Sequence, residues 1–401
     1  MISLAYGGMF NLLGVFLPDW ILIGTAAVLA FSITMMAIPV IVRVARLKNL
    51  CAIPNGRSSH VNAVPNLGGV GVFAGLVIST LLIAGNYFSF EMGYIICGFV
   101  ILFFVGIKDD ILVIDPRKKL AAQFAVAVML VVFSDIRINS FFEILNIGEI
   151  SYTVSIIISV LLIVLLINGF NLIDGIDGLA AGTGILASVS FGLWFRNTGS
   201  YGYTVMCFSL AGSLAAFIFF NVFGKKNKVF MGDTGSLLIG IAVSVMVIRF
   251  LRSDHGIILH RMTDASPALA LSVIILPLFD TIRIFIIRIC QGRSPFTADH
   301  QHIHHRLLEM GYSHLKSTLI LISVNIFFLF LCFFFRAVGD LLMICIVFSL
   351  STVSSWILLI MAKHHLIRSA RREDRQTSDK DEDGEKHVKE VARELELSHY
   401  N

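Results

Sequence analysis

Five short polar runs interrupt the long apolar stretches of this chain, and their residue types suit the binding of a metal ion and of phosphate groups. Carboxylate and amide oxygens are the ligands that Mg²⁺ prefers, while arginine, lysine and histidine donate hydrogen bonds to phosphate oxygens. The five runs are Arg57-Ser-Ser-His60, Asp109-Asp110, Asn168 to Gly178, Phe230 to Ser236 and His300 to Arg306.

The pair Asp109-Asp110 ends an apolar stretch. Two adjacent carboxylates at a membrane interface are costly unless a cation or a proton relieves their repulsion. A divalent metal ion that also binds phosphate is a common reason for such a pair. The alternative is an ordinary polar helix end, balanced by Lys108, Arg117 and Lys119.

In the third run, Asn171, Asp174 and Asp177 recur every three residues among glycines. On a helix this spacing would point the three side chains within one arc. Oxygen ligands beside glycines suit Mg²⁺ and phosphates. The alternative is a simple turn whose Asn and Asp side chains cap the backbone.

Asp233 is a lone carboxylate between glycines, just after the basic residues Lys225, Lys226 and Lys228. A metal–phosphate site would present a carboxylate in this way. The alternative is that Asp233 only caps the helix that follows.

Four histidines, His300, His302, His304 and His305, gather in the last run beside Arg306. They alternate too tightly for one zinc site on a regular element, and no cysteine stands near them. With the flanking arginines they favour contacts to phosphate or sugar hydroxyls; zinc and a plain loop are the alternatives. Asp280 and Arg283, inside an apolar run, are expected to form a structural ion pair within one helix.

Composition indicates that membrane helices position these runs. Hydrophobic residues make up 56% of the 401 residues, and charged residues only 14%, against about 25% in soluble domains. The six cysteines are scattered singly and read as small apolar residues. We therefore predict an all-α, polytopic membrane protein with a catalytic domain over 1–361 and a charged, disordered tail over 362–401.

A membrane span needs about 20 apolar residues. That length predicts eleven helices, near 20–42, 67–85, 93–108, 119–134, 153–169, 178–195, 203–223, 235–251, 267–289, 316–335 and 340–361. Basic residues concentrate in alternate connectors, which predicts an amino terminus outside and a carboxyl terminus in the cytoplasm. All five polar runs then fall on the cytoplasmic side, at one site.

Such a site suits phosphoryl transfer, which needs positioning and charge neutralisation more than covalent chemistry. The residues resemble those of the polyprenyl-phosphate N-acetylhexosamine-1-phosphate transferases, glycosyltransferase family 4. The resemblance covers about Arg57 to His314. It rests on the five runs together with Pro65, Gly68-Gly69 and Lys119.

The resemblance implies transfer of an N-acetylhexosamine 1-phosphate from a UDP-sugar to undecaprenyl phosphate, with release of UMP. The histidine motif resembles that of the members that use UDP-N-acetylglucosamine. It implies Mg²⁺, or Mn²⁺ in its place, bound by Asp233 and Asn171. Lys119 would contact the pyrophosphate, and Asp109 and Asp110 would orient or deprotonate the lipid phosphate.

The remaining implied roles concern the substrates. Asp174 and Asp177 would shape the nucleotide pocket, and the other expected substrate contacts are Arg57, His60, Asn168, His302, His304, His305 and Arg306. This chain has Ser58 where many members have a basic residue. The resemblance further implies a bacterial inner-membrane enzyme that starts a cell-surface polysaccharide, with no nucleic-acid partner and with a homodimer left open.

Two other functions fit part of the pattern. An intramembrane prenyltransferase binds a diphosphate through two aspartate-rich motifs, which Asp109 to Asp115 and Asn171 to Asp177 imitate, but it leaves Asp233 and the histidines without a task. A transporter predicts charges near the middle of the bilayer, whereas these charges crowd one interface.

Overall fold

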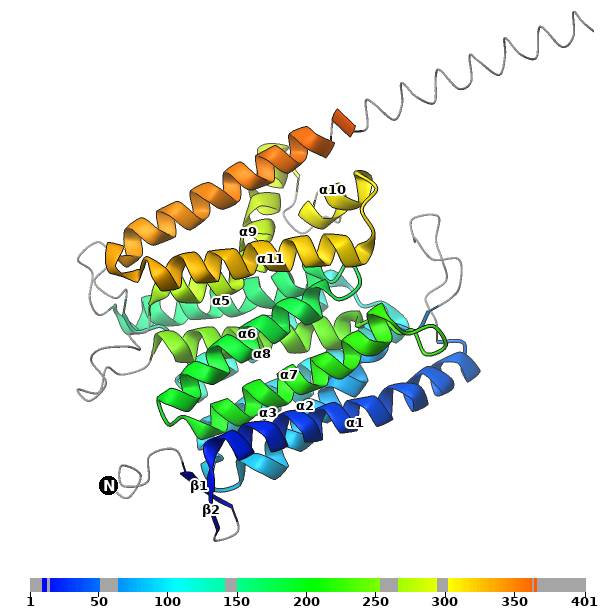
Figure 1. The fold of residues 1–401 in the computed structure, drawn as a ribbon, viewed down its shortest axis with the longest axis vertical. Helices are drawn as coiled ribbons and strands as arrows, with labels where there is room; N and C mark the ends of the chain where they lie inside the picture. Colours follow the sequence, from blue (N-terminus) through cyan, green and yellow to red (C-terminus); the bar gives the residue numbers. More distant parts are fainter. Residues whose placement is uncertain are drawn as a thin grey trace, which may run out of the picture.

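The computed structural model describes residues 9–12, 15–50, 64–140, 150–252, 266–293, 302–362 and 364–365. The long helices lie side by side as a bundle (Figure 1). A two-stranded antiparallel hairpin, β1 (Met9–Leu12) and β2 (Val15–Pro18), precedes them and was not predicted.

A helix lies at each of the eleven predicted positions. They are α1 (Asp19–Leu47), α2 (Gly68–Ala84), α3 (Phe90–Leu112), α4 (Pro116–Phe133), α5 (Tyr152–Ile173), α6 (Leu179–Asn197), α7 (Tyr201–Val222), α8 (Gly232–Leu251), α9 (Pro267–Cys290), α11 (His314–Phe334) and a last helix, Asp340–Ala362. Short 3₁₀ turns, η1 (Gly85–Tyr87) and η3 (Arg336–Val338), follow α2 and α11.

Nine of these helices in the described part of the chain are long and apolar enough to cross a membrane. The other two are α2, which has 17 residues, and α4, which carries Arg117, Lys118 and Lys119 in its first turn. Apart from the β1–β2 hairpin, the predicted bundle of membrane helices is therefore confirmed, while the count of eleven spans and the orientation stay predictions.

Helix α8 lies at the centre, packed against α2, α3, α5, α6 and α9, and nearly all of its apolar residues are buried. Glycines allow this close packing. A Cβ on Gly106 of α3 would lie 2.5 Å from Thr234 Cα, and one on Gly240 would lie 2.5 Å from Ile167 Cα. The first turn of α8, which holds Asp233, is thus clamped by its neighbours.

Ion pairs join charged residues at the end of the bundle near the hairpin. Arg196 donates to both carboxylate oxygens of Asp19 (2.8 and 3.1 Å), and Arg252 pairs with Asp135 at 2.6 Å. Arg252 lies at the end of the bundle predicted to be outside, where few basic residues are expected. Its pairing with Asp135 offsets its charge.

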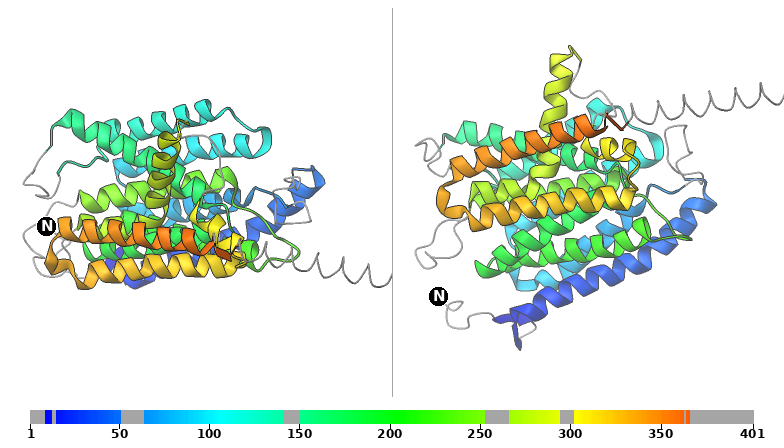
Figure 2. Two further views of the ribbon diagram at one scale, coloured as in Figure 1. Left: turned by 90° about the horizontal axis from the view of Figure 1, so that it is seen from above. Right: turned by 45° about the horizontal axis from the view of Figure 1, so that its top comes forward.

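Helix α9 contains Pro277, which removes a backbone hydrogen bond and bends helices. The later part of α9 turns steeply away from the other helices in the right-hand view of Figure 2. Beyond it lies a short helix, α10 (Ile303–Glu309), within the histidine run that was predicted as a loop. The first motif, Arg57 to His60, and most of the tail lie outside the described residues.

Candidate active site

The carboxyl ends of α3 and α5 and the amino ends of α4 and α8 meet at one end of the bundle, the right-hand end in Figure 1. They enclose a cleft of about 1100 Å³. Its lining contains the predicted residues Asp109, Asp110, Lys119, Asn168, Asn171 and Asp233. Asp110 and Asp233, which are 123 positions apart in sequence, thus come together as expected.

Asp110 holds the start of α8. Its carboxylate accepts hydrogen bonds from the backbone N–H groups of Asp233 (2.7 Å) and Thr234 (3.0 Å) and from the Thr234 hydroxyl (2.6 Å). A Cβ on Gly232 would lie 2.7 Å from the same carboxylate, and its φ of +72° also favours glycine. Asp110 therefore positions Asp233, and its predicted contact with the lipid phosphate stays a prediction.

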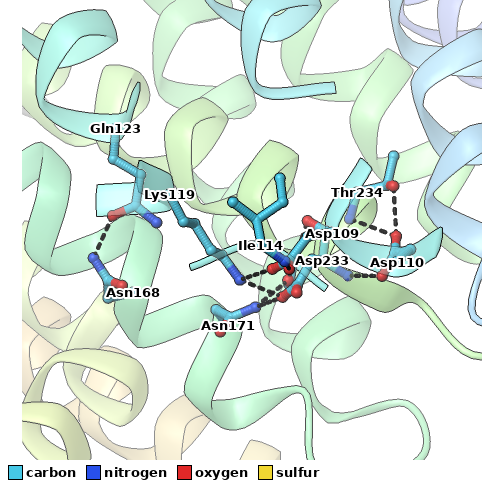
Figure 3. A network of polar contacts seen from close by, with 10 residues as sticks. Asp109, Asp110, Ile114, Lys119, Gln123, Asn168, Asn171, Asp233 and Thr234 are labelled. Carbon is cyan, nitrogen blue, oxygen red and sulfur yellow. Dashed lines mark hydrogen bonds and ion pairs between the residues drawn. The ribbon is translucent and has the colours of Figure 1, made fainter. Parts of the chain in front are cut away.

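Lys119 lies between two carboxylates. Its Nζ is 3.0 Å from Asp109 Oδ2 and 2.7 Å from Asp233 Oδ1 (Figure 3). The turn between α3 and α4 creates this geometry, because Ile114 N–H donates to Asp109 (2.6 Å) and Asp115 caps α4 by accepting from Arg117 N–H (2.8 Å). Two carboxylates and one ammonium leave a net negative charge at this point.

Asn171 completes this network. Its Nδ2 donates to Asp233 Oδ1 and to the Ser236 hydroxyl, the latter at 2.9 Å. Asp233, Asp109 and the Asn171 amide offer hard oxygen ligands, and Mg²⁺ is usually held by one or two carboxylates together with substrate phosphates. The donor set fits that ion. Among the described residues no cluster of three His, Cys, Asp or Glu suits a metal held by protein side chains alone.

Two further residues, which the sequence analysis did not single out, also line the cleft. Gln123, one helical turn after Lys119, accepts from Asn168 Nδ2 at 2.7 Å. Arg288, near the end of α9, lines the cleft and is only 2% exposed. The i, i+4 spacing of Lys119 and Gln123 on α4 was the available signal for the first.

The second half of the Asn168–Gly178 run does not continue on the helix. Helix α5 ends at Ile173, so Asp174 and Asp177 lie in the turn before α6. Asp177 pairs with Lys228 at 2.8 Å instead of joining Asp233. Loss of hydration raises the pKa of Asp174 well above its ordinary value, and the negative charges of Asp233, Asp110 and Asp177 raise it further.

The histidine run is anchored by Asp280. The expected pair with Arg283 is present (3.0 Å), but the carboxylate also binds His302 Nδ1 (2.8 Å) and accepts from the backbone N–H of Ile303 (3.3 Å). The purely intrahelical interpretation of Asp280 was therefore incomplete.

His304 is 1% exposed and packs on the turn after α5, where a Cβ on Gly175 would lie 2.3 Å from its Nε2. Its burial and then the neighbouring His305 lower the pKa of His304 to about 3. Arg306 pairs with Glu309 (2.8 Å). The rings of His302 and His305 lie next to His304, so the histidine run packs against the α5–α6 turn.

Comparison with known proteins agrees with this geometry. The sequence model of glycosyl transferase family 4 matches residues 92–251. Undecaprenyl-phosphate alpha-N-acetylglucosaminyl 1-phosphate transferase of Escherichia coli (strain K12) is 32% identical over 280 residues, which cover 68% of this chain and 72% of that protein. The chain belongs to glycosyl transferase family 4.

A second relative extends the match. The probable undecaprenyl-phosphate N-acetylglucosaminyl 1-phosphate transferase of Bacillus subtilis (strain 168) is 29% identical over 310 residues, 75% of this chain and 82% of that protein. The enzyme of Salmonella typhi with the same name as the E. coli protein is 33% identical over 272 residues, 65% of this chain and 69% of that protein.

The segment matched by the family 4 model contains the whole polar network of Figure 3, from Asp109 to Thr234. It ends before α9 and α10. The family 4 core thus supplies the four helix ends at the cleft, and α9 adds Phe285 and Arg288 to its lining.

Proposed function

We propose that this protein transfers N-acetylglucosamine 1-phosphate from its UDP-sugar to undecaprenyl phosphate and releases UMP. The observation that carries the proposal is the position of Lys119 between Asp109 and Asp233, beside Asn171, in a cleft at one end of a bundle of apolar helices. Family 4 membership and the printed names of the relatives support the substrates.

In this reaction an oxygen of the lipid phosphate attacks the β-phosphorus of the UDP-sugar. The new P–O bond forms as the bond from the β-phosphorus to the bridging oxygen breaks, and UMP leaves with that oxygen and its electron pair. A phosphate is already ionised near neutral pH, so no strong base is needed. The protein must bring two anions together, which requires charge neutralisation and positioning.

The cleft residues have separate tasks. Lys119 offsets negative charge on the pyrophosphate, and Asp110 holds the start of α8 so that Asp233 faces Lys119. Asp233 and Asn171, with Asp109 adjacent, would hold Mg²⁺, which when bound neutralises phosphate charge. The histidine run would contact the sugar phosphate from the side of the α5–α6 turn.

The finer topology belongs to the same proposal. We take the helices to make eleven spans in a bacterial inner membrane, with the amino terminus outside and the cleft open to the cytoplasm, as the basic connectors indicate. Mapping by cysteine labelling from either side tests it, and labelling of the α3–α4 turn from outside would contradict it. A homodimer stays a prediction.

The prenyltransferase alternative is not favoured. It needs the Asp109-Asp110 motif to bind a diphosphate, but the Asp110 carboxylate already accepts three hydrogen bonds from the start of α8. It also does not explain why Lys119 contacts Asp233.

The decisive experiment measures UMP release by the purified protein with undecaprenyl phosphate and a panel of UDP-N-acetylhexosamines. We expect release with UDP-N-acetylglucosamine, and loss of at least about 100-fold in Asp233→Asn, since one lost electrostatic contact in a transition state costs about that much. Asp135→Asn, the same change at the other end of the bundle, serves as the control. Pyrophosphate release, or no UMP with any donor, would overturn the proposal.

A further inference from the structure

Beyond Lys119, the cleft continues past a buried amide. Gln123 is fully buried on α4, and Asn168 of α5 holds its carbonyl oxygen. Figure 3 shows the Gln123 oxygen turned toward Asn168 and the nitrogen turned away, toward the side of Lys119. Both residues line the cleft.

The direction of the Gln123 amide follows from the hydrogen bonds of Asn168. Asn168 also contacts the backbone carbonyl of Val164 at 2.8 Å. A carbonyl oxygen only accepts, so the Asn168 atom that makes both contacts is its NH₂ group. The Gln123 atom facing it must then be the carbonyl oxygen, which leaves the Gln123 NH₂ on the cleft side.

That NH₂ group is a buried donor with no hydrogen-bond partner in the described part of the chain. Buried polar groups are nearly always hydrogen-bonded, and leaving one unsatisfied destabilises the fold. An orphaned donor in the wall of a substrate cleft indicates that a ligand oxygen meets it when the site is filled.

The surroundings indicate which ligand this is. Because α4 begins at the end of the bundle and runs inward, Gln123 lies about one turn, or about 6 Å along the helix, deeper than Lys119. The nearby lining includes Leu120, Leu172 and Phe285, together with the buried cation Arg288. A donor and a cation beside apolar walls suit an anionic headgroup that carries a hydrocarbon chain.

We propose that the Gln123 amide and the Arg288 guanidinium bind the phosphate of the polyprenyl phosphate acceptor, on the apolar side of the network formed by Asp109, Lys119 and Asp233. This inference rests on the proposed function. In this arrangement Asn168 does not touch the acceptor but sets the direction of the Gln123 amide.

Steady-state kinetics with each substrate varied tests the assignment. Gln123→Met keeps the length and burial of the side chain but removes the donor. We expect the KM for undecaprenyl phosphate to rise about tenfold or more, as for loss of a hydrogen bond to a charged group, with the KM for the UDP-sugar changed less than about twofold. Gln123→Glu, which keeps the oxygen that accepts from Asn168 and adds an anion, should raise the acceptor KM further at pH 8.

Gln291→Met and Gln291→Glu make the same changes at an exposed position at the end of α9 and should leave both KM values unchanged. A rise confined to the KM of the UDP-sugar would assign Gln123 to the donor and overturn the proposal. Unchanged values for both substrates in folded Gln123 variants would overturn it as well.

A binding measurement separates this inference from the proposed function, because it needs no turnover. Purified wild-type protein should bind farnesyl phosphate more tightly than farnesol, and Gln123→Met should remove most of that preference without weakening farnesol binding. If the wild type releases no UMP, the proposed function fails while this comparison still decides the role of Gln123. An equal preference in wild type and variant would contradict that role.

Discussion

The Nδ1 atom of His302 lies 2.8 Å from a carboxylate oxygen of Asp280, and both side chains are almost fully buried. The contact joins α9 to the start of α10, 22 residues later in the chain. Asp280 thereby fixes which ring nitrogen of His302 faces away from it.

This relationship predicts that Asp280→Asn damages both stability and catalysis. Removing one partner of a buried ion pair costs about 3–5 kcal/mol, and the retained amide should recover part of this. We expect a lower melting temperature and a kcat reduced about tenfold or more. Thermal unfolding and UMP release measure the two effects.

Asp135→Asn is a matched comparison, because Asp135 also pairs with two basic side chains but is 45% exposed. Exposed pairs contribute about 0–1 kcal/mol, so this variant should behave like wild type. Equal effects of the two substitutions would show that the Asp280–His302 contact contributes no more to stability or catalysis than an exposed ion pair does.

The oxygen-rich network around Asp233 predicts a divalent-metal requirement. Chelation with EDTA should stop UMP release, and Mg²⁺, or Mn²⁺ in its place, should restore it. Because Asn171 contacts Asp233 directly, Asn171→Ala should raise the Mg²⁺ concentration for half-maximal activity about tenfold. Asn197→Ala, at the exposed far end of α6, should not. Full activity in EDTA would contradict the metal assignment.

Buried His304 predicts that stability falls in mild acid. Its pKa is about 3 in the folded protein, below the ordinary value near 6.5, so the unfolded chain binds a proton more readily between these values. Stability should therefore fall as pH drops below about 6.5, by up to about 1.4 kcal/mol per pH unit from this group. His304→Gln should flatten the difference in melting temperature between pH 5 and pH 7.5, and an unchanged difference would contradict the assignment.

The apolar runs were enough to predict where the helices lie, because a membrane span has a characteristic length and composition. Alternation of the spans then placed Asp109, Asn171 and Asp233 at one end of the bundle. The partners were not predictable, because Asp110 meets Thr234 from 124 positions away. Only the i, i+4 spacing from Lys119 pointed to Gln123, and Arg288 is a single polar residue in an apolar helix, where no local pattern separates a cleft wall from a helix contact.

Close packing at the first turn of α8 predicts that catalysis is sensitive to a residue with no polar side chain. A Cβ on Gly106 would lie 2.5 Å from Thr234 Cα, so Gly106→Ala must push α3 away from the start of α8 and disturb the Asp110–Asp233 contact. Overpacking of this kind costs about 1–3 kcal/mol.

On an open helix face the same substitution instead stabilises by up to about 1 kcal/mol. Gly24 of α1, with no atom within 4 Å of an added Cβ, provides that control. UMP release should therefore fall sharply in Gly106→Ala and stay normal in Gly24→Ala, whereas equal activities would show that this helix contact does not position the active site.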